Sequence, residues 1–184
     1  MTEISLNVLD VAENSIRADA ALVVIVVHAD TKADTLTIEI NDNGRGMTQE
    51  QISKVEDPFF TTRKTRKVGL GVPFFKQAAE CTGGSFTIAS EVGKGTKVKA
   101  IFKLSHIDRM PLGDINGTIY TLITFNTNTE FLYIYRLDER SFTLDTREIK
   151  EILGDIPLDS PEVSSYIKEY LWENKNEVDH GVII

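Results

Sequence analysis

Hydrophobic side chains in the first third of the chain follow two different periods. Over residues 4–19, small and apolar side chains recur at helical spacing on more than one face, which predicts a helix buried around most of its circumference. Residues 21–28 form a continuous run rich in β-branched side chains, typical of a buried strand, and residues 36–40 alternate as a second strand. A short helix is expected through Val55, with Thr48 as its cap.

The middle of the chain predicts one longer helix and a hairpin. The helix is expected from about Val72 to Cys81, where the glycine pair at 83–84 ends it. Residues 85–90 and 96–104 are expected to form two strands, joined by a turn whose glycines suit a tight reversal.

The composition of the chain changes after residue 104. Residues 105–117 contain proline and glycine and predict a linker or an ordered loop. The last helix has the clearest signals, because Ser160 can cap it and Pro161 suits its first position. The elements expected in this segment are strands at 118–125, 131–136 and 141–144, and helices at 147–153 and 161–173.

Length, charge and cysteine content restrict the class of protein. The 184 residues suffice for one domain, or for one domain with an appendage. A net charge of −8 argues against nucleic acid or an anionic membrane as the main partner. The single cysteine, Cys81, permits no internal disulfide and fits a reducing compartment. The longest apolar run, residues 20–27, is too short to span a bilayer, and the N-terminus lacks the basic region of a signal peptide, so a cytoplasmic protein is expected.

Polar and charged residues interrupt the hydrophobic pattern in a regular order. Asp10 and Asn14 are four residues apart on a largely apolar helix and therefore share a face. Asp42 begins the sequence DNGRGM, between a predicted strand and a predicted helix. The glycine turn VGLGV at 68–72 opens the next helix, where backbone N–H groups suit an anion. Just before it, residues 63–67 carry four positive charges, which fits neutralisation of a polyphosphate. These features together predict a nucleotide pocket.

On these motifs, residues 5–104 resemble the Bergerat-fold ATP-binding domain of the gyrase, histidine kinase and MutL (GHKL) superfamily. Five motifs occur in family order, namely the N box LDVAENSIRADA, DNGRGM, the lid EDPFFTTRKTRK, VGLGV and GKGT. The resemblance implies an α/β fold in which helices cover one face of a mixed, mostly antiparallel sheet, an α+β two-layer sandwich. It also implies ATP and Mg²⁺ as cofactors. A histidine-kinase-like ATPase domain is expected over residues 1–104 and a small α/β extension over residues 105–184.

The resemblance assigns roles to residues of the first two motifs. Asn14 would coordinate magnesium through its side-chain oxygen, a hard ligand that this ion prefers. Asp10 falls where some members carry a glutamate that activates the attacking hydroxyl group or water. Asp42 would accept a hydrogen bond from the adenine amino group, and Gly44 and Gly46 would let the backbone approach the base.

The lid and the second glycine turn supply the residues that would bind phosphate. Thr62 and Lys64 of the lid are the expected direct contacts. Gly69, Leu70 and Gly71 belong to the turn whose N–H groups would bind the phosphates at the start of the helix.

Three further segments refine the resemblance. Pro73 departs from the family pattern and removes one N–H donor, although proline is tolerated in a first helical turn. Thr96 of GKGT is similar to the family threonine that supports adenine and a structural water. Residues 105–112 partly match the phosphoacceptor box of histidine kinases, but they follow the ATPase segment instead of preceding it. A structural loop in which Asp108 and Arg109 pair is therefore expected there.

The expected function is that of an ATP-binding protein. It would bind Mg-ATP and couple it to slow hydrolysis or to phosphoryl transfer to a separate protein. An ATPase or protein kinase activity is favoured, without the phosphoacceptor hairpin of a complete histidine kinase. One alternative is a serine/threonine kinase of the anti-sigma type, supported by Asp10. Another is a non-catalytic ATP-sensing module, supported by Pro73 and by the short Asp10 side chain. A clamp-type ATPase is least favoured because the extension is small, and the oligomeric state stays open.

Overall fold

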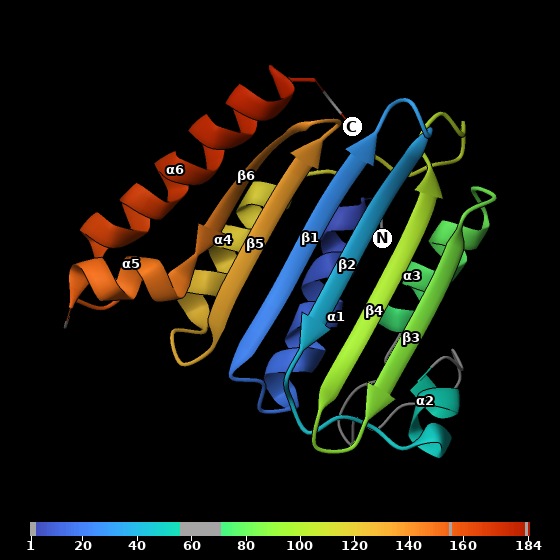
Figure 1. The fold of residues 1–184 in the computed structure, drawn as a ribbon, viewed down its shortest axis with the longest axis horizontal. Coiled ribbons are helices and arrows are strands. Elements are labelled where there is room, and N and C mark those ends of the chain that lie inside the picture. The colour runs from blue at the N-terminus through green and yellow to red at the C-terminus, as the bar shows by residue number, and fades with distance from the viewer. Residues whose placement is uncertain (1–2, 56–70, 155, 183) are drawn as a thin grey trace.

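The first 103 residues of the chain fold into helices behind an antiparallel sheet (Figure 1). The computed structural model describes residues 3–55, 71–154, 156–182 and 184. The elements of this part are α1 (Ile4–Arg17), β1 (Leu22–Asp30), β2 (Thr35–Asp42), α2 (Gln49–Val55), α3 (Gly71–Glu80), β3 (Ser85–Glu91) and β4 (Gly95–Lys103). Each helix and strand predicted up to residue 104 is present, within a few residues of its expected bounds.

The remaining residues extend the same sheet. The elements here are α4 (Ile115–Phe125), β5 (Glu130–Leu137), β6 (Arg140–Asp145), α5 (Thr146–Leu153) and α6 (Pro161–Asp179). The sheet has six strands in the order β3-β4-β2-β1-β5-β6, and every pair is antiparallel except β1 with β5. Strand β5 pairs directly with β1, so one sheet includes strands from both sides of residue 104. The division of the chain into two domains at residue 104 therefore stays a prediction.

The hydrophobic core lies between the sheet and one layer of helices. Alternate residues of each central strand are buried, as the pleat of a strand requires. Figure 1 shows α1, α3 and α4 behind the sheet, and α6 packs against α4 and β6 at one edge. Fully buried side chains of the strands include Val23, Val27, Leu36, Ile38, Phe102, Tyr133 and Tyr135. The predicted architecture, helices on one face of a mixed and mostly antiparallel sheet, is therefore confirmed. Within the described ranges, no helix is both long and apolar enough to cross a membrane.

The strand predicted at residues 118–125 is wrong, because these residues form most of helix α4. The segment is rich in β-branched and aromatic side chains, which favour strands in isolation. Its buried residues nevertheless recur at helical spacing, at Ile115, Ile119 and Leu122. Asp114 caps the helix by accepting a hydrogen bond from the backbone N–H of Gly117. The packing of α4 against α1 and the cap at Asp114 together outweigh the local preference for a strand.

The loop before α4 is ordered, but the predicted pair of Asp108 and Arg109 is wrong. The Arg109 guanidinium instead donates hydrogen bonds to the backbone carbonyl groups of Leu104 and Met110, at 2.8 and 3.0 Å. Asp108 lies beside His106, with 4.0 Å between its carboxylate and the imidazole Nδ1. The loop is thus held by backbone acceptors, in keeping with a structural role.

A buried carboxylate, that of Asp179, connects the C-terminal end of α6 to strand β5 of the sheet. The Asp179 side chain is 1% exposed and accepts hydrogen bonds from Lys175 Nζ, from the Tyr135 hydroxyl group and from the Gly181 N–H. Burial raises the pKa of Asp179, but the three hydrogen bonds outweigh it and hold this pKa below its usual range. The carboxylate therefore stabilises the fold in its charged form.

We expect acid to weaken this contact in a measurable window. Because the pKa of Asp179 is lower in the folded state, its contribution to stability is full above about pH 4 and is lost as the pH falls through the folded-state value. In urea titrations, the free energy of unfolding of the native protein should fall more steeply below pH 4 than that of Asp179→Asn, which is less stable at pH 7 by about 1–3 kcal/mol. Equal slopes for the two proteins would contradict the assignment.

Candidate functional site

The side chain of Asp42 is fixed at the end of β2 by donors from three parts of the fold. Its Oδ1 atom accepts hydrogen bonds from the backbone N–H of Gly44 at 2.9 Å and of Thr96 at 3.1 Å. Its Oδ2 atom accepts a hydrogen bond from the Ser15 hydroxyl group at 2.6 Å. A carboxylate offers about four acceptor positions, so about one remains for a further donor. The half-buried side chain is thus oriented before any ligand arrives.

Ser15 is a site residue that the sequence interpretation missed. Ser15 lies within the helix predicted over residues 4–19, among its small and apolar side chains, and it is 4% exposed. Its hydroxyl group, however, points to Asp42, 27 residues away in the chain. The signal was present in the sequence, because a hydroxyl group on an otherwise apolar stripe needs a partner when it is buried.

Ser90 on β3 is a second such residue. Its hydroxyl group accepts a hydrogen bond from the Met47 N–H at 2.8 Å and donates to the Gly95 carbonyl oxygen at 2.8 Å. It also lies 2.9 Å from the Thr96 hydroxyl group. Ser90 therefore fastens the DNGRGM turn to the β3–β4 hairpin. Nothing in the local sequence predicts this role, which depends on how the DNGRGM turn lies against the β3–β4 hairpin.

The glycines of DNGRGM lie where backbone segments cross closely. Gly44 is buried, and a Cβ atom there would lie 2.7 Å from the Ala18 carbonyl oxygen. Gly46 has φ +67°, and a Cβ atom there would lie 1.9 Å from the Glu91 carbonyl oxygen. Only glycine fits at Gly46, because both the conformation and the space exclude a side chain. The structure thus explains both glycines by close approach of protein segments, while contact with a base stays a prediction.

Asp10 and Asn14 lie on α1 with different surroundings. Asp10 is half-buried, and a Cβ atom built on Gly71 would lie 2.8 Å from the Asp10 Cβ. Asn14 is exposed, and its side-chain oxygen accepts a hydrogen bond from Arg17 Nη1 at 2.9 Å. An amide oxygen has two lone pairs, so one acceptor position of Asn14 remains.

The start of α3 faces Asp10. Gly71 and Pro73 are buried in its first turn, so the helix tolerates proline there as expected. The other phosphate-contact predictions, at Thr62, Lys64, Gly69 and Leu70, lie outside the described residues.

Thr96 is the residue of the GKGT motif that reaches the site. It is the Cα partner of Asp42 in the antiparallel β2–β4 pair. Its N–H donates to the Asp42 carboxylate and its hydroxyl group contacts Ser90. The fold therefore brings together Ser15 of α1, Asp42, Gly44 and Thr96, whereas Asn14 faces solvent beside Arg17.

The chain is similar to bacterial sensor proteins over its first part. Sensor protein DegM of Bacillus sp. (strain B21-2) is 33% identical over 90 residues, which cover 49% of this chain and 24% of DegM. Sensor protein kinase FleS of Pseudomonas aeruginosa is 36% identical over 108 residues, which cover 59% of this chain and 26% of FleS. The match thus spans about a quarter of the length of each of these relatives.

The fold is similar to that of a solved structure described as the N-terminal domain of a DNA repair protein. The TM-score is 0.56 at 16% sequence identity, and the match covers 84% of this chain and 58% of the other. At this identity the likeness shows the fold alone. Residues 2–106, more than half of the chain, match the family described as histidine kinase-, DNA gyrase B- and HSP90-like ATPase. This chain belongs to that ATPase family.

Proposed function

We propose that the chain binds ATP with Mg²⁺ and couples it to slow hydrolysis or to phosphoryl transfer to a separate protein. The observation that carries the proposal is the Asp42 carboxylate, oriented by Ser15, Gly44 and Thr96 with an acceptor position to spare. Family membership supports nucleotide binding as the use of that position.

The chemistry of Asp42 favours adenine over guanine. A carboxylate is an acceptor without protons to donate, so it pairs with an amino group. Adenine presents an amino group where guanine presents a carbonyl oxygen, and two acceptors facing each other repel. We therefore expect Asp42 to select ATP against GTP.

Asn14 is our candidate ligand for the metal. Mg²⁺ takes oxygen ligands and keeps several waters, so a single protein oxygen together with the nucleotide phosphates is a reasonable set. Bound there, the ion would supply neutralisation of the phosphate charge. Among the described residues no group of three histidine, cysteine, aspartate or glutamate side chains forms an alternative metal site. The free lone pair of the Asn14 oxygen fits this role, and Arg17 would orient the amide.

Asp10 is our candidate general base. It lies one helical turn before Asn14, and therefore on the same face of α1. Its position against Gly71 places it at the N-terminal end of α3, where backbone N–H groups favour an anion. In this role Asp10 would take the proton of the attacking hydroxyl group or water.

The same position of Asp10 also suits the alternative of a serine/threonine protein kinase of the anti-sigma type. In that case the attacking hydroxyl group belongs to a partner protein instead of water. A non-catalytic ATP-sensing module is the other candidate, favoured by the exposure of Asn14 and its bond to Arg17.

Replacing Asp10 with asparagine should separate binding from turnover. We expect the affinity for ATP to stay within about threefold of the native value, while phosphate release falls by at least about a hundredfold, the usual size of a general-base contribution. Isothermal titration and a phosphate-release assay measure the two quantities. The exposed Asp159→Asn serves as the matched control and should change neither.

Other outcomes would select a different function. If the native protein binds ATP but releases no phosphate in the absence of partners, the remaining candidate functions are phosphoryl transfer to a partner protein and ATP sensing. Incubation of heat-inactivated cell extract with γ-labelled ATP, with and without the protein, then distinguishes those two, because only a kinase transfers label that is absent without the protein. Unchanged release in Asp10→Asn would remove Asp10 as the base.

A further inference from the structure

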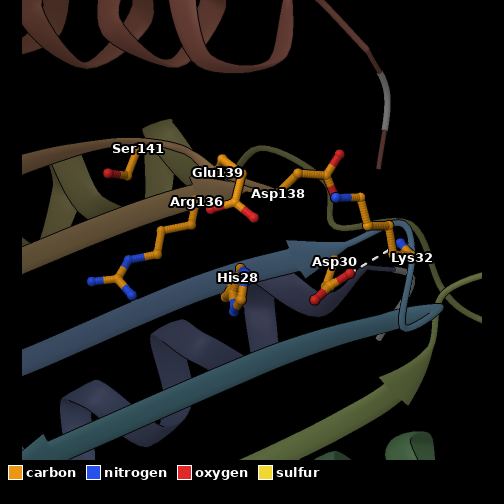
Figure 2. Close-up of a pocket in the computed structure, with 7 residues that line it drawn as sticks. All are labelled: His28, Asp30, Lys32, Arg136, Asp138, Glu139 and Ser141. Atoms are coloured by element: carbon orange, nitrogen blue, oxygen red, sulfur yellow. Dashed lines mark hydrogen bonds between the residues drawn. The ribbon is translucent and has the colours of Figure 1, made fainter.

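A polar hollow lies on the face of the sheet opposite the helices, at the C-terminal ends of β1 and β5 (Figure 2). Its volume is about 280 Å³. Seven residues line it, and they come from β1, the β1–β2 turn, β5, the β5–β6 turn and the start of β6: His28, Asp30, Lys32, Arg136, Asp138, Glu139 and Ser141.

The rim of this hollow is built from two hairpin turns that are fastened to each other. The Asp138 carboxylate of the β5–β6 turn accepts hydrogen bonds from the N–H of Thr31 at 2.7 Å and from its hydroxyl group at 2.9 Å. The Asp30 carboxylate accepts from the N–H groups of Lys32 and Ala33. The bonds between Thr31 and Asp138 connect residues 107 positions apart, and they hold the pKa of Asp138 below its usual range, led by the backbone bond from Thr31. The concave shape is therefore preorganised.

The floor of the hollow carries polar side chains that do not take part in the hydrogen bonds and ion pairs of the described structure. His28 and Arg136 are register partners in the parallel β1–β5 pair, and Arg136 and Ser141 are partners in the β5–β6 pair. They form one row across three strands on the uncovered face. Within the described residues, the side chains of His28, Arg136, Ser141 and Glu139 make no hydrogen bond or ion pair. An unpaired guanidinium beside an imidazole and a hydroxyl group is suited to an oxyanion.

The charges of the hollow exclude a polyanion. Three acidic and two basic side chains line it, a formal charge of −1 with histidine neutral. Figure 2 shows the guanidinium of Arg136 extending away from Asp30 and Lys32, with Glu139 above His28 between them. A ligand with an anionic group at one end and a cationic group at the other matches this arrangement, and its net charge of zero avoids repulsion by the acidic protein.

The volume limits the ligand to a small molecule. A hollow of about 280 Å³ has the capacity of about nine water molecules at roughly 30 Å³ each, below the range of drug-sized sites. ATP is too large for it. Val23, the Cα partner of Asp42, lies five residues from His28 along β1. At roughly 3.3 Å per residue the two sites are about 17 Å apart, and the sheet itself separates the hollow on its uncovered face from Ser15 and α1 on the other.

We propose that this hollow binds a free α-amino acid. Arg136 and Ser141 contact the carboxylate, while Glu139 and the remaining oxygen of Asp30 receive the ammonium group. His28 lies between the two ends and contacts the backbone of the ligand. The site gives the chain a second small-molecule ligand, independent of whether ATP is bound or hydrolysed.

The test begins with the native protein and a panel of the free proteinogenic amino acids, screened by ligand-observed NMR. We expect at least one to bind. Its C-terminal amide, which lacks the carboxylate, and its deaminated analogue, which lacks the ammonium group, should each bind at least about tenfold more weakly by titration, since each loses a charged hydrogen-bonding group. Binding by no member of the panel, or equal binding of either analogue or of inorganic phosphate, would overturn the proposal.

Two arginine variants locate the site. Arg136→Gln should weaken binding of the same amino acid at least about tenfold. Arg140→Gln removes a neighbouring arginine that does not line the hollow, and it should bind as the native protein does. Equal affinities for the two variants would place the ligand elsewhere and refute the proposal. Thermal midpoints and ATP affinity, both expected to be unchanged, show that any loss at Arg136 is local.

Discussion

Replacing Asp42 with asparagine should lower the affinity for ATP by at least about a hundredfold while the protein stays folded. Asparagine can keep an oxygen at the Oδ1 position, which accepts from the N–H groups of Gly44 and Thr96. Its amino group then takes the Oδ2 position, where the Ser15 hydroxyl group can rotate to accept instead of donate. The internal bonds survive in this arrangement. What is lost is the charge and the acceptor for the adenine amino group, worth about 3 kcal/mol together.

Titration calorimetry with ATP measures this loss directly. Asp108→Asn removes a charge of the same kind at a position whose side chain is 77% exposed, and it should leave the affinity unchanged. Thermal unfolding of Asp42→Asn should lie within a few degrees of the native midpoint, because the hydrogen bonds of the turn persist. An affinity within about threefold of the native value would show that adenine is not bound at Asp42.

The sequence predicted the elements up to residue 104 because short-range signals agree with the tertiary structure there. Around Asp42, the glycines and the flanking strand lie within a few residues of one another, so a local pattern describes a local structure. Residues 118–125 are the opposite case. Their β-branched side chains favour a strand, and only the cap at Asp114 and the contact with α1 decide for a helix.

The contacts that orient the site side chains were not predictable in the same way. Ser15 reaches Asp42 from 27 residues away, and Ser90 reaches Met47 across 43. The first contact depends on how α1 lies on the sheet, and the second on how the DNGRGM turn lies against the β3–β4 hairpin; no local pattern predicts either arrangement. The row of His28, Arg136 and Ser141 has the same origin, because it exists only through the parallel pairing of β1 with β5.

Residues beyond 104 support the helix that carries Asp10, Asn14 and Ser15. The first N–H groups of α1, which have no partner within a helix, donate to the carbonyl groups of Pro111 and Leu112 at 2.9 Å. Helix α4 packs against α1, and β5 extends the sheet beside β1. The C-terminal segment is therefore part of the support of the candidate site, and a ligand or partner that shifts α4 would act on α1 directly.

Alanine at Gly95 should disrupt both the fold and the candidate site, whereas alanine at Gly93 in the same turn should not. Gly95 is buried with φ +107°, and a Cβ atom there would lie 1.9 Å from the Asp42 carbonyl oxygen. That oxygen belongs to backbone, so the clash forces β4 away from β2 and removes Thr96 from the Asp42 carboxylate. Gly93 has φ +79° but no atom within 4 Å of a Cβ.

The two variants separate steric exclusion from conformational cost. Gly93→Ala adds only the strain of a left-handed conformation, which should lower the free energy of unfolding by about 1–2 kcal/mol. This variant should bind ATP as the native protein does. Gly95→Ala adds the overlap with backbone, so we expect a loss of about 4 kcal/mol or more in urea titrations, with ATP affinity lost in any protein that folds. Similar losses of stability in both variants would mean that β4 can move away from Asp42 at little cost. The close β2–β4 contact would then not be what holds Thr96 on the carboxylate.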